Sequence, residues 1–304
     1  MQQYHTAVLL NPAIDGLAVR PQGIYVDATF GGGGHARAIL ELLGPGGRLI
    51  AFDQDQDVQQ HIPQDERFTL VPANFMYIHN FLNELGISAV DGILADLGVS
   101  SHHFDAPARG FSFRKDGALD MRMDKNASQT AAQLINQAPA EQLAQIFEDY
   151  GEIKAPHNIV AHIMAQRPLH TTRQLADALR SFPQGKVGNK LIVKIFQALR
   201  IEVNHELDAL KRLLRHAPAV LKPGGRMAVI SFHSLEDRLV KQFFKSGHFG
   251  AQPQHPVWGS SQPPMRPVNK KVILPTQEEI KNNPRASSAK LRIAQRQKPA
   301  THDS

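Results

Sequence analysis

The sequence predicts an α/β protein with a doubly wound, mostly parallel Rossmann-like sheet and an inserted all-helical subdomain. Three observations lead to this fold class. Strand and helix signals alternate at short intervals through the first hundred residues, as in βαβ units with a parallel sheet. A glycine-rich turn stands between the first strand and the first helix after it. A long stretch with helical periodicity alone then separates the fourth strand signal from the fifth.

The strand signals are short apolar runs bounded by turn residues. The fifth run is set off by the turn Lys222-Pro223-Gly224-Gly225, and two further runs near the C-terminus are plausible final strands. The predicted strands are 24–28, 48–53, 67–71, 91–96, 226–231, 271–274 and 289–294.

The stretch between the fourth and fifth strands carries helix start and stop signals. Pro139 and Gly151 bracket one helix over 140–150, and Thr171-Thr172 can cap another over 173–182. Two longer helical patterns cover 189–202 and 205–221. We therefore divide the chain into a first domain part, 1–104, an inserted helical subdomain, 105–205, and a second domain part, 206–304.

Composition excludes several classes of protein. The chain has 304 residues, 42% of them hydrophobic, and no cysteine, which excludes disulfides, thiolate metal sites and a cysteine nucleophile. No apolar run approaches the ~20 residues of a membrane span, and Met1 to Leu10 does not resemble a signal peptide. His102 and His103 lack a suitably spaced third ligand. We expect a cytoplasmic protein that neither contacts a membrane nor holds a metal.

The positive charge is concentrated in the C-terminal segment. The chain has 34 Lys and Arg against 28 Asp and Glu, a net charge of +6. Residues 265–304 hold nine Lys and Arg and three Asp and Glu, so the whole excess lies there. Such a segment suits a polyanionic partner, with a solvated basic terminus as the alternative.

The glycine-rich turn predicts a nucleotide-like ligand. The run Gly31-Gly32-Gly33-Gly34 follows a strand that ends at Asp27, and glycines let the backbone approach a ligand without side chains in the way. The second strand ends in Asp53, where a carboxylate can accept hydrogen bonds from ribose hydroxyls. Together these features indicate an adenosine-containing cofactor.

Two cofactors remain candidates. Gly31, Gly33 and Ala36 fit the dinucleotide fingerprint of a nicotinamide dehydrogenase. However, Asp27 would repel a pyrophosphate, whereas it would attract the ammonium and sulfonium groups of S-adenosylmethionine. The sequence therefore favours S-adenosylmethionine over NAD.

Residues at the ends of the third and fourth strands complete the predicted site. Ligands of doubly wound sheets lie outside the carboxyl ends of the strands. Asp96, which ends the fourth strand, should border the methyl group. Phe75, which follows the third strand, should flank the adenine, with core packing as its alternative role.

Four long sequence blocks are distinctive, and the most specific of them is the first. They are RGFSFRKDGALDMRMD, FQALRIEVNHEL, LKPGGRMAVISFHSLEDRLVK and NPRASSAKLRIAQR, at 109–124, 196–207, 221–241 and 284–297. In these blocks the chain resembles one family, the bacterial small-subunit ribosomal RNA (cytosine-N(4))-methyltransferases of the RsmH/MraW type. The resemblance implies a methyltransferase sheet and methyl transfer from S-adenosylmethionine. The implied substrate is small-subunit ribosomal RNA or the assembled small ribosomal subunit.

The resemblance also implies a set of cofactor contacts. Three positions depart from the family pattern: Gly32 stands where a larger residue is common, His103 where glutamine is frequent, and Ile153-Lys154 where a second acid is usual. The implied contacts are Gly33, Gly34, His35, Asp53, Phe75, Asp96 and His103.

Methylation of a cytosine amine requires an acceptor for its N–H and a place for the released proton. DNA amino-methyltransferases place an N/D/S-P-P-Y/F motif after the fourth strand, but this chain has Asp96-Leu97-Gly98-Val99 there. Phe232 could stack on the target base. The catalytic candidates are Asp96, Ser100, Ser231, Phe232 and His233.

A segment at the start of the insertion mixes basic and aromatic residues. This composition suits single-stranded RNA, although four aspartates leave a salt-bridged surface loop as the alternative. A DNA amino-methyltransferase and a non-catalytic RNA-binding factor remain rival functions. The residues concerned are Arg109, Phe111, Phe113, Arg114, Lys115, Arg122 and Lys125.

Overall fold

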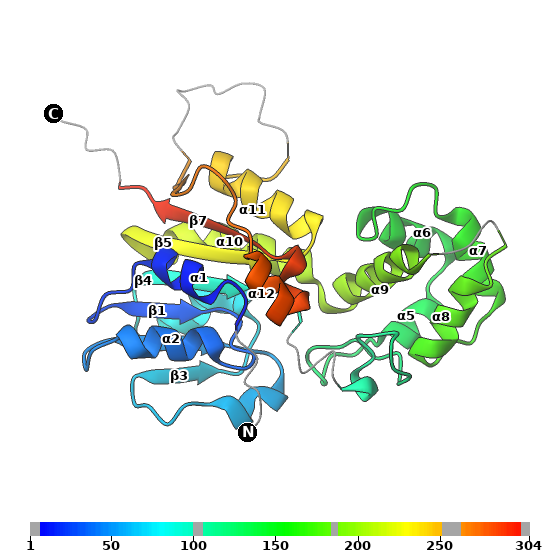
Figure 1. Ribbon diagram of the computed structural model, residues 1–304, viewed down its shortest axis with the longest axis horizontal. Coiled ribbons are helices and arrows are strands. Elements are labelled where there is room, and N and C mark those ends of the chain that lie inside the picture. The colour runs from blue at the N-terminus through cyan, green and yellow to red at the C-terminus, as the bar shows by residue number, and fades with distance from the viewer. Residues whose placement is uncertain (1–6, 100–105, 184–187, 251–262, 299–304) are drawn as a thin grey trace. The chain divides into compact units, whose positions relative to one another are not determined.

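The computed structural model describes residues 7–99, 106–183, 188–250 and 263–298, and it divides the chain into two compact units. Unit 1 combines residues 1–98 with 207–304, and unit 2 comprises residues 99–206. The chain therefore leaves unit 1 after its fourth strand, builds unit 2, and returns to complete the sheet (Figure 1).

Unit 1 is built on a seven-stranded sheet with the order β3-β2-β1-β4-β5-β7-β6. The first five strands in this order are parallel, and β7 runs antiparallel to β5 and to β6. The predicted doubly wound, mostly parallel fold is confirmed. The strands are β1 (Ile24–Asp27), β2 (Arg48–Phe52), β3 (Phe68–Val71), β4 (Val90–Asp96), β5 (Leu221–Ser231), β6 (Met265–Pro267) and β7 (Lys290–Arg296).

Helices cover both faces of this sheet because the central strands are apolar on both sides. Buried side chains of α3, α10 and α11 pack with one face, and those of α1 and α2 with the other. The bounds are α1 (Leu10–Leu17), α2 (Gly34–Leu42), α3 (Ile78–Glu84), α10 (Glu206–Val220) and α11 (Ser234–Ser246), with the short helices η1 (Gln56–His61), η2 (Phe75–Tyr77), α12 (Gln277–Asn282) and η4 (Pro284–Ser288).

The C-terminal part of the sheet differs from expectation. Residues 271–274 were expected to form a strand, but only Ile273 forms an isolated bridge, to Leu291. The strand at the sheet edge is instead β6, which begins just after Pro263-Pro264 and pairs with β7. The expected strand 289–294 is present as β7, between β5 and β6.

Three of the nine cations in the basic C-terminal segment form contacts inside the protein. Arg292 donates from Nε and Nη2 to the two carboxylate oxygens of Asp237, at 2.7 and 3.1 Å, and Lys290 Nζ lies 3.7 Å from the same carboxylate. Arg296 donates to the carbonyl of Leu221. These internal contacts leave the three cations less available to an RNA partner than the sequence suggests.

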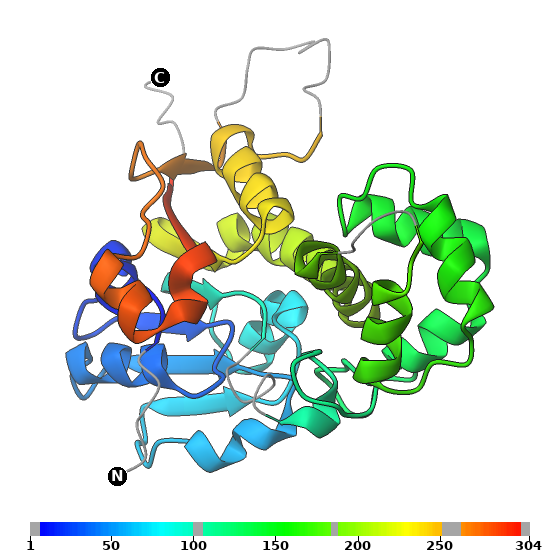
Figure 2. The same cartoon turned by 45° about the vertical axis from the view of Figure 1, so that its right-hand side comes forward.

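Unit 2, drawn in green in Figures 1 and 2, consists of helices and irregular loops around its own apolar core. Capping boxes begin two of its helices, with Thr130 and Gln133 before α5 and with Thr171 and Gln174 before α8. The elements are η3 (Pro107–Arg109), α5 (Ala131–Gln137), α6 (Ala140–Asp149), α7 (His157–Ala165), α8 (Thr172–Arg180) and α9 (Asn189–Asn204).

Three of the seven residues of the basic and aromatic segment at the start of unit 2 have structural roles. Arg109 is buried and donates to the carbonyls of Arg122 and Met123, both at 3.0 Å. Arg122 forms a bidentate pair with Asp120, and Phe111 lies in the core. These contacts favour the salt-bridged alternative over an RNA-binding surface.

Within the described ranges, no helix has the length and apolar character needed to cross a membrane.

Candidate active site

The glycine turn joins β1 to α2 with little space for side chains. Gly33 has a φ of 71°, and a Cβ there would lie 2.9 Å from the ring of Phe30. A Cβ on Gly34 would lie 2.8 Å from the Cβ of Ala7. At Gly32, by contrast, nothing lies within 4 Å of the added carbon, so the larger residue that is common in the family would also fit there. The turn therefore requires glycine at 33 and 34.

Asp53, directly after β2, is held against this turn. Its Oδ2 accepts a 2.8 Å hydrogen bond from the amide of Gly31, and its Oδ1 accepts one of 2.9 Å from the amide of Asp55. Each carboxylate oxygen has a second lone pair. The carboxylate is thus fixed in position at the carboxyl end of β2, where the rule for doubly wound sheets places the ligand.

Asp27 is fully buried at the carboxyl end of β1. Its Oδ1 accepts from the amide of Thr29 at 3.1 Å, while its Oδ2 has no hydrogen-bond partner among the described residues. Burial, with a smaller contribution from the charge of Asp53, raises the pKa of Asp27 from 3.8 to about 7. A buried carboxylate oxygen without a partner is costly unless a ligand supplies a donor or a positive charge.

The raised pKa of Asp27 predicts a pH-dependent stability. The folded protein retains a proton that the unfolded chain releases near pH 3.8, so this stabilisation is complete below that pH and is lost as the pH rises through about 7. A shift of about 3 pH units, at about 1.4 kcal/mol each, corresponds to roughly 4 kcal/mol. Asp27→Asn should therefore unfold at higher denaturant than the ligand-free wild type at pH 8, but not at pH 4.

The measurement is the difference in unfolding free energy between the two proteins from pH 4 to 8. Taking the difference is necessary because burial lowers the pKa of His35 to about 4, which gives a slope of opposite sign. If the difference in unfolding free energy were the same at all pH values, the pKa of Asp27 would not be raised in the folded protein.

Asp96, at the end of β4, is a second carboxylate with an unpaired oxygen. Its amide donates to Thr29 Oγ1 at 2.6 Å, and its Oδ1 is buried without a hydrogen-bond partner in the described part of the chain. Burial, followed by the charges of Asp27 and Glu236, raises the pKa of Asp96 well above 3.8. This electrostatic coupling shows that the strand ends bring several carboxylates together.

His35, in the first turn of α2, is neutral at physiological pH. Its Nε2 lies 3.1 Å from the carbonyl of Val8, which requires a proton on that nitrogen. Its unprotonated Nδ1 then faces Oδ2 of Asp96 at 3.8 Å. His35 thus links the glycine turn to Asp96 without adding a positive charge.

Phe75 follows β3 and is partly buried against the apolar cluster beneath it. Asn74 fixes its position, since Asn74 Oδ1 accepts from the amide of Met76 and Nδ2 donates to Gln54 at 2.9 Å. Gln54 directly follows Asp53 in the chain. Phe75 therefore combines the packing role with a partly exposed side chain near the strand end that carries Asp53.

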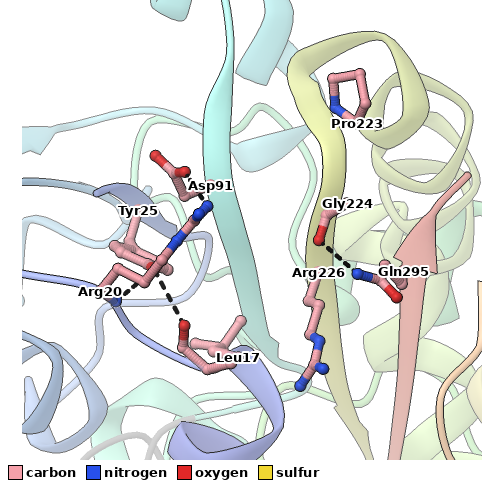
Figure 3. Close-up of a pocket in the computed structure, with 9 residues that line it drawn as sticks. Leu17, Arg20, Tyr25, Asp91, Pro223, Gly224, Arg226 and Gln295 are labelled. Atoms are coloured by element: carbon pink, nitrogen blue, oxygen red, sulfur yellow. Dashed lines mark hydrogen bonds and ion pairs between the residues drawn. The ribbon is translucent and has the colours of Figure 1, made fainter. Parts of the chain in front are cut away.

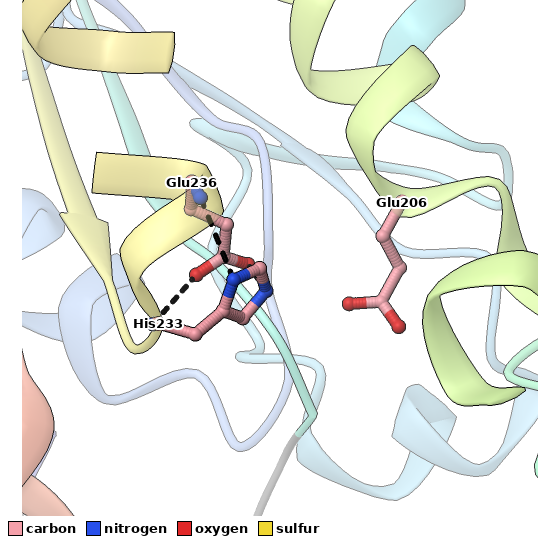
Figure 4. Close-up of side chains that lie close together, drawn as sticks. All are labelled: Glu206, His233 and Glu236. Atoms are coloured by element: carbon pink, nitrogen blue, oxygen red, sulfur yellow. Dashed lines mark hydrogen bonds and ion pairs between the residues drawn. The ribbon is translucent and has the colours of Figure 1, made fainter. Parts of the chain in front are cut away.

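The end of β5 carries the other three candidates. Ser231 is buried, and its Oγ lies 3.4 Å from the carbonyl of Lys290. Phe232 is partly buried, and its amide donates to Glu236 at 2.8 Å. His233 caps α11: its Nδ1 accepts from the amide of Glu236 at 3.4 Å (Figure 4).

The cap of α11 determines the tautomer of His233. Because Nδ1 accepts a hydrogen bond, a neutral His233 carries its proton on Nε2. This nitrogen lies 3.2 Å from Glu236 Oε1 but makes no aligned hydrogen bond within the described ranges, and it is buried. Glu236, only 2% exposed, was missed by the sequence reasoning, although the His-x-x-Glu spacing of a capping box before an apolar helix could have indicated it.

Two predicted residues, Ser100 and His103, lie outside the described residues. The others all belong to unit 1, at or just after the carboxyl ends of β1 to β5.

A cavity of about 320 Å³ lies near the amino ends of the strands of the same sheet, away from the carboxyl ends that carry the candidate site (Figure 3). Its buried carboxylate, Asp91, accepts from Arg20 at 2.6 Å, from Lys222 at 2.7 Å and from the amide of Ile24 at 2.9 Å. Both oxygens of this aspartate therefore have partners. Asp91 thus holds the amino ends of the strands together, whereas Asp27 and Asp96 at the carboxyl ends each have one oxygen without a hydrogen-bond partner among the described residues.

These observations fit S-adenosylmethionine. The glycine turn admits a ligand close to the backbone, and Asp53 presents acceptors for a ribose. The unpaired oxygens of Asp27 and Asp96 provide the negative charge that an ammonium and a sulfonium require. A pyrophosphate would meet these carboxylates with repulsion, so NAD does not fit.

Comparison with known proteins identifies the family. The model of the MraW methylase family matches residues 2–297. A "Ribosomal RNA small subunit methyltransferase H" from Flavobacterium johnsoniae is 51% identical over 297 residues, which cover 97% of this chain and 98% of that protein. Proteins of the same name from Parabacteroides distasonis and Bacteroides fragilis are each 50% identical, over 96% of this chain and 97% of theirs. A family match over almost the entire chain, supported by relatives of matching length, means that this protein is a methyltransferase and belongs to the MraW methylase family.

Proposed function

We propose that the protein transfers a methyl group from S-adenosylmethionine to the exocyclic amino nitrogen, N4, of a cytidine in small-subunit ribosomal RNA. The methylase family accounts for the reaction class and the cofactor. The RNA substrate is supported by the name shared by relatives about 50% identical to this chain. Such an enzyme works in the cytoplasm, where the ribosomal RNA of bacteria is assembled.

We infer that the target base is cytosine from two buried polar atoms at the ends of adjacent strands. Asp96 Oδ1, after β4, is an acceptor, and His233 Nε2–H, after β5, is a donor. Cytosine presents the complementary pair, since its N4 amine donates and its N3 accepts. Uracil presents an acceptor and a donor in the reverse order, so it would leave both protein atoms unpaired.

Each residue then has a defined role. Asp96 accepts an N–H of the target amine and takes up the proton as the nitrogen becomes tetrahedral, which its raised pKa favours. His233 holds the base through its ring edge, and Phe232 provides a face for stacking. Ser231 is a positioning residue, because its bond to Lys290 fixes the end of β5.

The cofactor supplies an already activated methyl group on its sulfonium. Positioning therefore accounts for most of the catalysis. Gly33, Gly34 and His35 form its binding turn, and Asp53 and Phe75 hold its nucleoside. His103 is assigned to the same set by family resemblance.

The experiment is mass mapping of methylated nucleosides in small-subunit ribosomal RNA from cells with and without the protein. The purified enzyme is then tested on free RNA, on small subunits and on single-stranded DNA. We expect N4-methylcytidine to be absent from the ribosomal RNA of cells without the protein. We also expect the purified enzyme to form it on the RNA substrates and not on DNA. Methylation of DNA alone would favour a DNA amino-methyltransferase, and no methyl transfer at all would favour a non-catalytic binding factor.

Asp53→Ala should weaken S-adenosylmethionine binding about ten- to hundredfold. The substitution removes a charged acceptor for the ribose, and such a bond contributes about 1.5–3 kcal/mol. Calorimetric titration measures the effect, with circular dichroism to verify that the variant is folded. An unchanged dissociation constant in a folded variant would show that Asp53 only supports the glycine turn.

A further inference from the structure

Helices α10 and α11 of unit 1 cover the same face of the sheet, and both carry basic residues that are exposed to solvent. Arg212 and Arg215 are exposed one turn apart on α10, next to the partly exposed Lys211. On α11 the exposed positions follow the same periodicity; they are Arg238, Lys241 and Lys245. We call these six residues the α10–α11 basic face.

The acids of these helices do not neutralise that face. Glu206 pairs with Arg200, Glu236 is buried, and Asp237 pairs with Arg292. Asp208 pairs with one member of the face, Lys211, at 3.2 Å. Four others form no ion pair with an acid among the described residues; they are Arg212, Arg215, Lys241 and Lys245.

Aromatic contacts join the two helices into one surface. The guanidinium of Arg215 lies 5.2 Å from the centre of the Phe249 ring, and this ring stacks on Phe243 of α11 at 5.3 Å. Burial, followed by the positive charges of His79, Arg212 and Arg215, lowers the pKa of His216. The two arginines thus lie close enough to His216 to act on its charge, although burial has the larger effect.

The composition of the face distinguishes between polyanions. Helices that lie on membranes combine basic residues with large exposed apolar ones. The large exposed apolar side chains of the described chain are Leu42, Ile62, Tyr77, Val193, Val268 and Leu274, and none of them lies on α10 or α11. Lysine and arginine on rigid helices, without apolar anchors, suit the phosphates of a nucleic acid backbone.

We propose that the α10–α11 basic face binds the sugar–phosphate backbone of small-subunit ribosomal RNA, at a position away from the methylated nucleotide and independently of base sequence. This inference rests on the proposed function for the identity of the RNA. In this proposal the α10–α11 basic face, and not the C-terminal segment, makes the main electrostatic contact with RNA, because Lys290 and Arg292 of that segment pair with Asp237.

The test compares two fourfold variants. One neutralises the face with Arg212→Gln, Arg215→Gln, Lys241→Gln and Lys245→Gln. The matched control removes four exposed cations elsewhere in unit 1, with Arg48→Gln, Lys270→Gln, Lys271→Gln and Lys281→Gln. Both variants have the same net charge, so a difference in their RNA affinity depends on where the cations were removed. Dissociation constants for purified small-subunit ribosomal RNA are measured between 0.05 and 0.3 M KCl.

The face variant should bind RNA about 100-fold more weakly at 0.1 M salt. Its plot of log affinity against log salt should flatten by about 3, since each lost phosphate contact removes roughly 0.7–0.9 from the slope. The control should keep at least two-thirds of the wild-type slope, and both variants should bind S-adenosylmethionine as the wild type does.

Equal slopes for the two variants would overturn the proposal. So would loss of binding to vesicles of anionic phospholipid with RNA binding intact, because the face would then serve a membrane. Failure of the wild type to methylate ribosomal RNA would instead refute the proposed function, while the comparison of binding slopes would still test the face.

Discussion

Replacing Asp96 by asparagine is expected to lower the rate constant for methyl transfer about 10²- to 10⁴-fold, the range typical of a lost general base. Asparagine retains the shape and an acceptor oxygen, but it cannot take up a proton. Since the pKa of Asp96 is raised by burial, a neutral amide also fits its site without loss of stability. Single-turnover kinetics with saturating cofactor separate this effect from cofactor binding.

Asp91→Asn is the matched control for this variant. Asp91 is also a buried aspartate of β4, but it lies at the amino end of the strand and bonds to Arg20 and Lys222. Its replacement should reduce stability and leave the single-turnover rate within about threefold of the wild type. If Asp96→Asn were as active as this control, Asp96 would not be the proton acceptor.

Removing unit 2 is expected to abolish methylation of ribosomal RNA while unit 1 stays folded and binds the cofactor. Unit 2 has a separate apolar core, drawn entirely from its own residues, and the two cores of unit 1 use none of them. Residues 99–206 would be replaced by a short glycine–serine linker. We interpret unit 2 as the part that recognises and presents the RNA, and presentation is what the reaction depends on.

Two measurements on one preparation test this division. Cofactor affinity should fall, because His103 is removed with unit 2, but should remain measurable. Methyl transfer to small ribosomal subunits should be undetectable. Retained methylation would show that unit 2 is not needed for recognition, and a cofactor affinity equal to that of the full chain would remove the role assigned to His103.

The parallel part of the sheet could be predicted because its strands are buried on both faces. Such strands are nearly continuous apolar runs, and β1, β2 and β4 are recognisable from sequence alone. The edge was not predictable in the same way. Residues 271–274 have strand-forming side chains but only one bridge, whereas β6 contains Pro267 and pairs because β7 offers an open edge.

The candidate site was predictable where function depends on position along a strand. Asp27, Asp53 and Asp96 could be placed by the rule that ligands lie at the carboxyl ends of parallel strands. The partners of charged groups could not, because they depend on contacts between distant residues. Arg292 was assigned to RNA, yet it bonds to Asp237, 55 residues earlier in the chain. For the same reason the sequence did not reveal the charge coupling between Asp96 and Glu236.

The interruption of the sheet between β4 and β5 has a consequence for biosynthesis. On the ribosome, β1 to β4 emerge first, and they must wait for all of residues 99–206 before β5 can pair with β4. Unit 2, whose contacts are local in sequence, can fold during that delay. The half-built sheet meanwhile exposes the edge of β4 and an uncovered apolar face, a state prone to association with other chains. We therefore expect nascent chains of this protein to depend on chaperones until β5 has been made.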